Sequence, residues 1–169
     1  MHPFVALAKN AVEEYITRRK VLHPPEELPV DMKQKAGVFV CLKIGGELRG
    51  CIGTFLPSAD NLHDEIVRNA VAAATEDPRF CPLLETELEA VRYTVDVLST
   101  PERIKDPAEL DPKKYGVVVV KGARRGLLLP DLEGVDTVED QLKITKMKAG
   151  IDPSDDNVEI FKFSVERYK

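Results

Sequence analysis

A cysteine flanked by glycines and preceded by an arginine is the part of this sequence best suited to chemistry. The hexapeptide Leu-Arg-Gly-Cys-Ile-Gly occupies positions 48–53, with Arg49 two residues before Cys51. The thiolate is the nucleophilic form of cysteine, and a nearby guanidinium favours it over the thiol. Gly50 and Gly53 weaken a strand, which suggests a bulge, close approach of another backbone, or amides exposed to a ligand. Cys51 is therefore a candidate nucleophile, and Arg49 a candidate activator or anion clamp.

Plainer interpretations of these residues stay open. Cys51 also fits a small buried apolar residue, with Arg49 a surface charge. His63 is the nearest histidine in sequence and a candidate base for Cys51, although an exposed histidine is common in the first turn of a helix. Asp77 and Arg79 follow that helix and either line a cleft or form a salt bridge in the loop at its end.

A second group of candidates is a basic segment around a glycine. Lys121, Arg124 and Arg125 either hold an anion against the backbone of this turn or form a solvated hairpin tip. The glycines lack the GxGxxG spacing and following helix of a dinucleotide site. The candidate binding residues are Gly50, Gly53, Thr54, Asp77, Arg79, Lys121, Arg124 and Arg125.

Composition narrows the classes of protein. The chain has 169 residues, 43% hydrophobic and 31% charged, a balance typical of one globular domain and not of collagen or a disordered chain. Its 24 basic and 29 acidic residues give a net charge of −5, which argues against a general binder of phosphate backbones. Cys41, Cys51 and Cys81 show neither CxxC nor zinc spacing with the histidines, and no export signal is visible. We therefore expect a reduced cytoplasmic protein without a structural metal or a membrane segment.

The hexapeptide falls on a predicted β-hairpin. Residues 37–53 are rich in strand-forming side chains around two central glycines, which suit a two-residue turn. With that loop, Val40 pairs with Cys51, and Cys41 lies on the opposite face. We then expect no disulfide between the two cysteines, although a bulge at Gly50 would reverse the assignment.

The other elements follow from hydrophobic periodicity and from capping residues. Their order fits an α+β fold with a mostly antiparallel sheet. We predict helices at 4–16, 62–75 and 138–149, and further strands at 93–98, 117–120, 126–129 and 158–165.

Several segments together resemble one family. The hexapeptide at 48–53, the Asp-Pro-Arg-Phe segment at 77–80 and the Gly-Leu-Leu-Leu-Pro segment at 126–130 are similar to the family named after the AMME chromosomal region gene 1 product. More narrowly, the chain resembles the prokaryotic form of this domain, in the AmmeMemoRadiSam system. One departure is Cys81, where a second proline is more usual, so no family role is carried over to it.

The resemblance implies a fold more firmly than a function. It implies one family domain over 1–169, with a large and a small lobe around a curved antiparallel sheet flanked by helices, and the hexapeptide facing a cleft between them. It also implies two partners, a Memo-like protein and a radical S-adenosylmethionine protein. It names no reaction and no cofactor.

The sequence leaves three candidate functions for this protein. The first is an accessory or modifying enzyme in a radical- or redox-linked pathway, with Cys51 as nucleophile or covalent acceptor. The alternative is a non-catalytic binding module for a protein partner or a nucleotide, shaped by the hexapeptide. The weakest is RNA binding through Arg49, Lys121, Arg124 and Arg125.

Overall fold

The computed structural model describes residues 1–169, which form two compact units. The first unit contains residues 1–98 and 166–169, and the second contains residues 99–165. Each unit has its own four-stranded sheet and at least one helix, which confirms the predicted α+β class. No helix has the length and apolar character that crossing a membrane requires.

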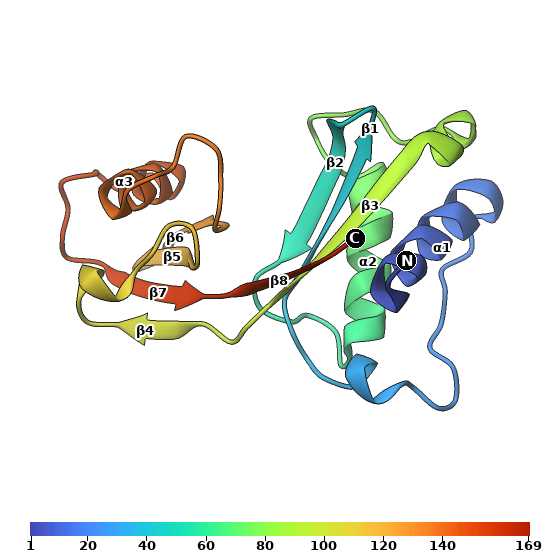
Figure 1. The fold of residues 1–169 in the computed structure, drawn as a ribbon, viewed down its shortest axis with the longest axis horizontal. Helices are drawn as coiled ribbons and strands as arrows, with labels where there is room; N and C mark the ends of the chain where they lie inside the picture. The colour runs from blue at the N-terminus through green and yellow to red at the C-terminus, as the bar shows by residue number, and fades with distance from the viewer. The chain divides into compact units, whose positions relative to one another are not determined.

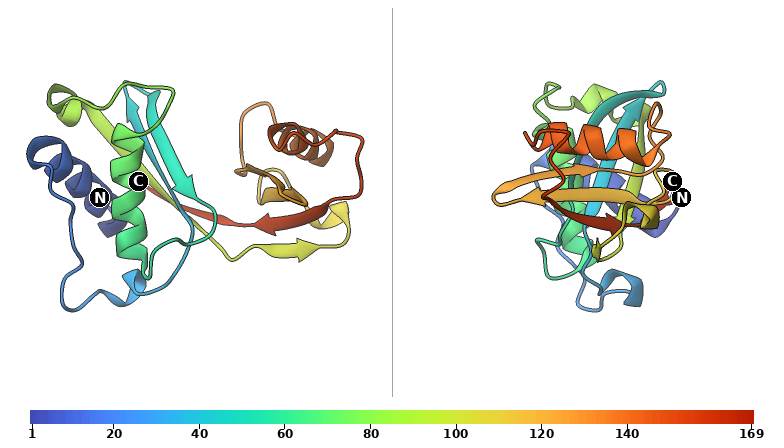
Figure 2. Two further views of the ribbon diagram at one scale, coloured as in Figure 1. Left: turned by 180° about the vertical axis from the view of Figure 1, so that it is seen from behind. Right: turned by 90° about the vertical axis from the view of Figure 1, so that its left-hand side faces the viewer.

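The first unit packs two helices against one face of a sheet, as Figures 1 and 2 show. The strand order is β2-β1-β3-β8, and β1 runs antiparallel to both of its neighbours. The elements are α1 (Pro3–Arg18), a 3-10 turn (Val30–Met32), β1 (Val38–Ile44), β2 (Glu47–Thr54), α2 (Leu62–Thr75), a second 3-10 segment (Glu85–Ala90), β3 (Val91–Leu98) and β8 (Val165–Tyr168).

The core of this unit follows the patterns that predicted its elements. Phe4, Ala8 and Val12 recur at helical spacing on α1 and are buried, and Val38 and Val40 alternate along β1 with no exposed surface. The helix α2 begins at an asparagine N-cap and carries Asp64 and Glu65 in its first turn, where carboxylates are favourable. The predicted first and second helices and the hairpin are confirmed.

The second unit has the strand order β4-β7-β5-β6, with α3 packed on β5 and β6 (Figure 1). The capping threonine Thr137 accepts a hydrogen bond from the Asp140 N–H, so the predicted helix begins where its capping pattern placed it. The elements are β4 (Glu102–Ile104), a 3-10 turn (Pro107–Glu109), β5 (Gly116–Lys121), β6 (Arg124–Leu128), α3 (Val138–Lys148) and β7 (Glu159–Phe163).

The single closing strand predicted at 158–165 is wrong. It is interrupted at Ser164 into β7 and β8, which belong to different sheets. The backbone groups of Ser164 instead exchange hydrogen bonds with Ser99, which itself follows the end of β3. Side-chain alternation continues across the interruption, so the period alone does not reveal that the chain passes from one sheet to the other.

The predicted register of the hairpin is confirmed next to the turn, where Ile44 pairs with Glu47, but is wrong in the rest of β2. Leu42 pairs with Gly50 and Lys43 with Leu48, so Arg49 is an extra residue without a partner on β1. Val40 consequently pairs with Ile52 and not with a cysteine. Because of this bulge, every residue of β2 after Arg49 lies on the opposite face of the sheet from the predicted one.

Candidate functional site

The bulge brings Cys41 and Cys51 directly opposite each other. Their Cα atoms are 4.1 Å apart and their sulfur atoms form a disulfide, so the expectation of two cysteines pointing apart is wrong. The physical reason is the period of two along a strand, because one extra residue exchanges the faces. A nucleophilic role for Cys51 would therefore require reduction of this bond, since the free thiolate is the reactive species.

The disulfide lies on the face of the first sheet that is opposite α1 and α2. Neighbours of Cys41 along β1 point to the helices and are fully buried, whereas both cysteines are half-buried. On the same face, Phe39 pairs with Gly53 on one side and with Asp96 on the other. We call this the helix-free face, meaning the side of the sheet that carries Phe39, Cys41, Cys51, Gly53 and Asp96. No helix of the first unit covers it (Figure 2).

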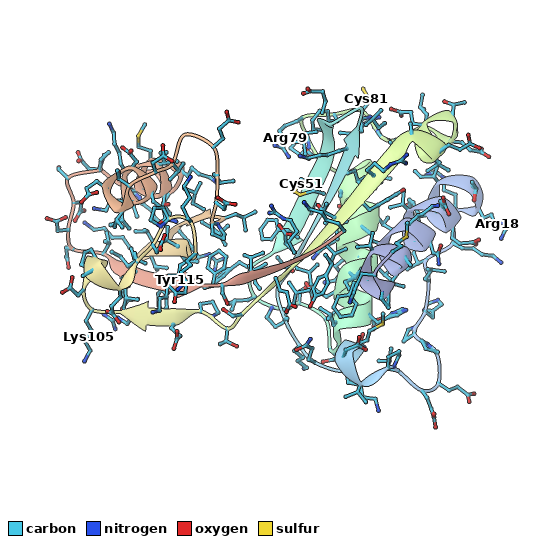
Figure 3. All side chains as sticks on the ribbon, viewed as in Figure 1. Arg18, Cys51, Arg79, Cys81, Lys105 and Tyr115 are labelled. Carbon is cyan, nitrogen blue, oxygen red and sulfur yellow. A yellow bond between two sulfur atoms is a disulfide. The ribbon has the colours of Figure 1, made fainter.

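The backbone of Cys51 is held by a buried carboxylate. The Cys51 N–H donates to Asp77 Oδ2 at 2.9 Å, and the Asp77 side chain is 2% exposed. The Arg79 guanidinium donates to both Asp77 oxygens, at 3.0 and 2.8 Å, and lies 3.4 Å from the Cys51 carbonyl oxygen. Figure 3 shows Arg79 beside Cys51 and the free cysteine, Cys81, apart from both. Asp77 and Arg79 therefore form the salt bridge in the loop after α2 that was one of their two predicted roles, and both also contact the Cys51 backbone.

These contacts favour the ionised form of Asp77. Hydrogen bonds from the Arg79 guanidinium hold the pKa of the Asp77 carboxyl well below its usual range, outweighing the opposing effect of burial, and the Cys51 N–H adds to the shift. The same ion pair raises the pKa of Arg79. The guanidinium is also 5.6 Å from the centre of the Phe80 ring, at the distance of a cation–π contact.

We expect Asp77 to stabilise the protein only while it is ionised. Its pKa is lower folded than unfolded, so its contribution is complete above about pH 5 and is lost as the pH falls through the lowered value. Asp77→Asn should lower the free energy of unfolding at pH 7 by about 2 kcal/mol. It should also reduce the decline of stability between about pH 5 and pH 2. Urea unfolding at a series of pH values measures both, with Asp31→Asn at an exposed position as the control; an unchanged acid decline in Asp77→Asn contradicts the assignment.

Arg49 is engaged in structural contacts. Its guanidinium makes two hydrogen bonds to Glu87, at 2.8 and 3.0 Å, and one to the Cys81 carbonyl oxygen at 2.9 Å. The hydrogen bonds that Arg49 donates to Glu87 raise the pKa of Arg49 and lower that of Glu87. Arg49 therefore fastens β2 to the segment after α2, and an anion would have to compete with Glu87 for it. Nothing in the local sequence around Glu87 marks it as this partner.

The glycines of the hexapeptide have a packing explanation. A Cβ on Gly50 would lie 2.1 Å from the Ala73 carbonyl oxygen of α2, and one on Gly53 would lie 2.3 Å from the Phe39 ring. At both positions only glycine leaves room for the neighbouring atoms, and such a close approach is a common reason for glycine within a strand.

Thr54 belongs to a buried polar network. Its hydroxyl donates to Glu65, and it accepts from the Asn69 side chain at 3.1 Å. Glu65 has no exposed surface and also accepts the Ser58 and Ala59 N–H groups at 2.8 and 2.7 Å. The sequence reasoning missed Glu65, although a carboxylate in the first turn of a predicted helix was a signal. The network ties the loop after β2 to α2.

His63 and the basic turn do not join this arrangement. His63 is 5% exposed, which corrects its expected exposure, and its Nδ1 lies 3.0 Å from Asp64. In the second unit, Lys121 contacts Asp155, and Arg124 donates to the Gly150 carbonyl oxygen at 2.8 Å. The third basic residue of this turn, Arg125, also has an interaction partner. No group of three or more His, Cys, Asp or Glu side chains is arranged to hold a metal ion.

Known proteins are similar to this one over nearly the whole chain. The model of the AMMECR1 family matches residues 5–168. A Thermotoga maritima protein is 58% identical over 170 residues, covering 99% of this chain and 98% of that protein. A Clostridium acetobutylicum protein is 48% identical over 99% of this chain, which spans only 36% of that relative. The crystal structure of an uncharacterized protein from Pyrococcus horikoshii has a TM-score of 0.88 and 34% identity, covering 97% of this chain and 88% of that one.

Proposed function

Because the chain belongs to the AMMECR1 family and its hexapeptide cysteine is bonded to a cysteine of the neighbouring strand, we propose that it is an accessory thiol-redox enzyme. Cys41 and Cys51 cycle between a disulfide and a dithiol and exchange two electrons with a partner in each cycle. The observation that carries the proposal is the half-buried disulfide on the helix-free face.

The chemical step is thiol–disulfide exchange with a protein dithiol. A partner thiolate attacks one sulfur of the Cys41–Cys51 bond, forms a mixed disulfide and releases the other cysteine as a thiolate. The partner's second thiolate then attacks the mixed disulfide and releases the remaining cysteine. The partner is oxidised to a disulfide, and Cys41 and Cys51 take up the two electrons and two protons.

A cytoplasmic location is part of this proposal. Disulfides in that compartment are mostly transient, and serve catalysis or redox sensing, because cellular thiols keep cysteines reduced. A half-buried pair on the helix-free face has exposed surface that such thiols can reach.

Two quantities test the proposal: the number of reactive thiols in each redox state and the midpoint potential of the Cys41–Cys51 pair. The oxidised protein should react with one equivalent of maleimide, at the exposed Cys81, and the reduced protein with three. Equilibration in glutathione and dithiothreitol buffers should place the midpoint potential between roughly −270 and −120 mV, where thiol-redox proteins work. Intact-mass spectrometry after alkylation gives both results.

Matched serine variants separate the cysteines. Cys41→Ser and Cys51→Ser should each abolish oxidation of a reduced thioredoxin-like dithiol by the protein, whereas Cys81→Ser should leave it unchanged. A midpoint below about −300 mV marks a structural disulfide and contradicts the proposal. Equal labelling of all three cysteines after air oxidation also contradicts it.

The proposed partners are a Memo-like protein and the radical S-adenosylmethionine protein of the AmmeMemoRadiSam system. The Clostridium relative supports a domain that works beside other domains, since the matching region is 36% of its length. The same observation favours the second candidate, a non-catalytic binding module. Pull-down of the Memo-like protein by Cys51→Ser at wild-type strength, together with a structural midpoint potential, would select the binding module over the redox enzyme.

A further inference from the structure

A pocket in the second unit shares no residue with the candidate site. It encloses about 810 Å³ and is lined by residues of β4, β7 and α3 and by the segment that precedes β7. The helix α3 packs mainly on β5 and β6, as Figure 1 shows. The strand residues that line the pocket come from β4 and β7. This volume is within the usual range for sites that bind small molecules.

Apolar side chains from three elements line one part of the pocket. Ile104 of β4 and Ile160 of β7 are direct cross-strand partners, and Leu142 of α3 joins them. Ile160 and Leu142 are only partly buried, although both pack on the core of this unit. Apolar surface is therefore available to a ligand at this place.

A buried ammonium lines the same pocket. Lys146 lies one helical turn after Leu142, and its side chain is 7% exposed. Its Nζ donates to the Pro153 carbonyl oxygen at 3.2 Å, and the nearest carboxylate, Asp156, is 3.6 Å away with a side chain 98% exposed. An ammonium has three donors, and a pair with an exposed carboxylate stabilises little. Donor capacity and positive charge therefore remain for a ligand.

We propose that this pocket binds a small amphipathic carboxylate. Its carboxylate accepts a hydrogen bond from Lys146 Nζ, and its apolar part covers Ile104, Leu142 and Ile160. Three cations line the pocket, but Arg103 is exposed and paired with Glu159, and Lys105 is exposed, so Lys146 is the one buried cation. One buried ammonium beside apolar surface suits a monoanion, whereas a phosphate is usually held by several donors such as arginines or a helix N-terminus. The proposal is independent of the redox function, because its residues lie in the second unit and include no cysteine.

The test is an amide NMR titration of the full chain with hexanoate, and with hexanamide and hexyl phosphate as matched probes. Hexanoate should shift the amides of residues 104, 142, 146 and 160 and bind about tenfold or more tightly than hexanamide. Lys146→Met keeps the apolar stem and should remove this preference. Lys143→Met, on the same helix but outside the pocket, should keep it.

A measurement on the unmodified chain guards against a variant that fails to fold. Hexanoate should slow acetylation of Lys146, but not of Lys143, as followed by peptide mass spectrometry. Tighter binding of hexyl phosphate would overturn the carboxylate assignment. Shifts confined to other residues, or equal affinities for hexanoate in the two methionine variants, would overturn the site itself.

Discussion

Replacing Gly50 by alanine is expected to lower the free energy of unfolding by about 3 kcal/mol. The new Cβ would lie 2.1 Å from the carbonyl oxygen of Ala73. The Cβ is fixed to the backbone of β2 and the oxygen is part of the backbone of α2, so neither can move without its element. The strand must withdraw from the helix, which opens the core between them. Urea unfolding of the reduced proteins measures the loss without a contribution from the disulfide.

Gly45→Ala in the turn of the same hairpin is the matched control. Gly45 has a φ of 61°, and a Cβ added there would meet no atom within 4 Å, so this substitution costs only the left-handed backbone penalty, about 1 kcal/mol. If the two variants lose the same stability, close packing is not the reason for glycine at position 50. The comparison thus separates crowding from backbone conformation within one hairpin.

Glu65→Gln is the second substitution with a large expected effect, about 3 kcal/mol at pH 7. The amide keeps the shape of the side chain but places a donor where the Ser58 and Ala59 N–H groups now donate to Oε2. If the amide turns its oxygen to these N–H groups, its NH2 instead meets the Thr54 and Ser58 hydroxyls that now donate to Oε1. In either orientation one accepting oxygen and the negative charge are lost in a site without exposed surface. Thermal and urea unfolding measure the loss, and Glu76→Gln, at the exposed end of α2, should change stability by less than about 0.5 kcal/mol.

The pH dependence of this effect has a definite sign. Burial raises the pKa of Glu65, but hydrogen bonds from Thr54, Ala59 and Ser58 outweigh it, so the net pKa is lowered. The stability that Glu65 adds is therefore complete above about pH 5 and is lost as the pH falls through the lowered value. The difference between wild type and Glu65→Gln should shrink in acid. A difference that grows in acid would mean that Glu65 is protonated in the folded protein.

The candidate site could be found from sequence, but its internal contacts could not. The hexapeptide, Asp77 and Arg79 were all recognisable, and the Cys51 N–H does meet the Asp77 carboxylate. Arg49 was expected to serve Cys51, and instead it binds Glu87, 38 residues away. A guanidinium can pair with any carboxylate in reach, and only the folded chain determines which one that is.

By itself the sequence determined the class of fold and most of its elements. Helical and strand periods, capping residues and the two turn glycines are local signals, because each depends on residues within a few positions of one another. Tertiary structure decided the register of β2, the change of sheet at Ser164 and the pairing of the cysteines. A bulge at Arg49 depends on how closely Gly50 can approach Ala73 of α2, and no window of sequence contains both partners of that contact. One extra residue in a strand then turned two cysteines expected on opposite faces into a bonded pair.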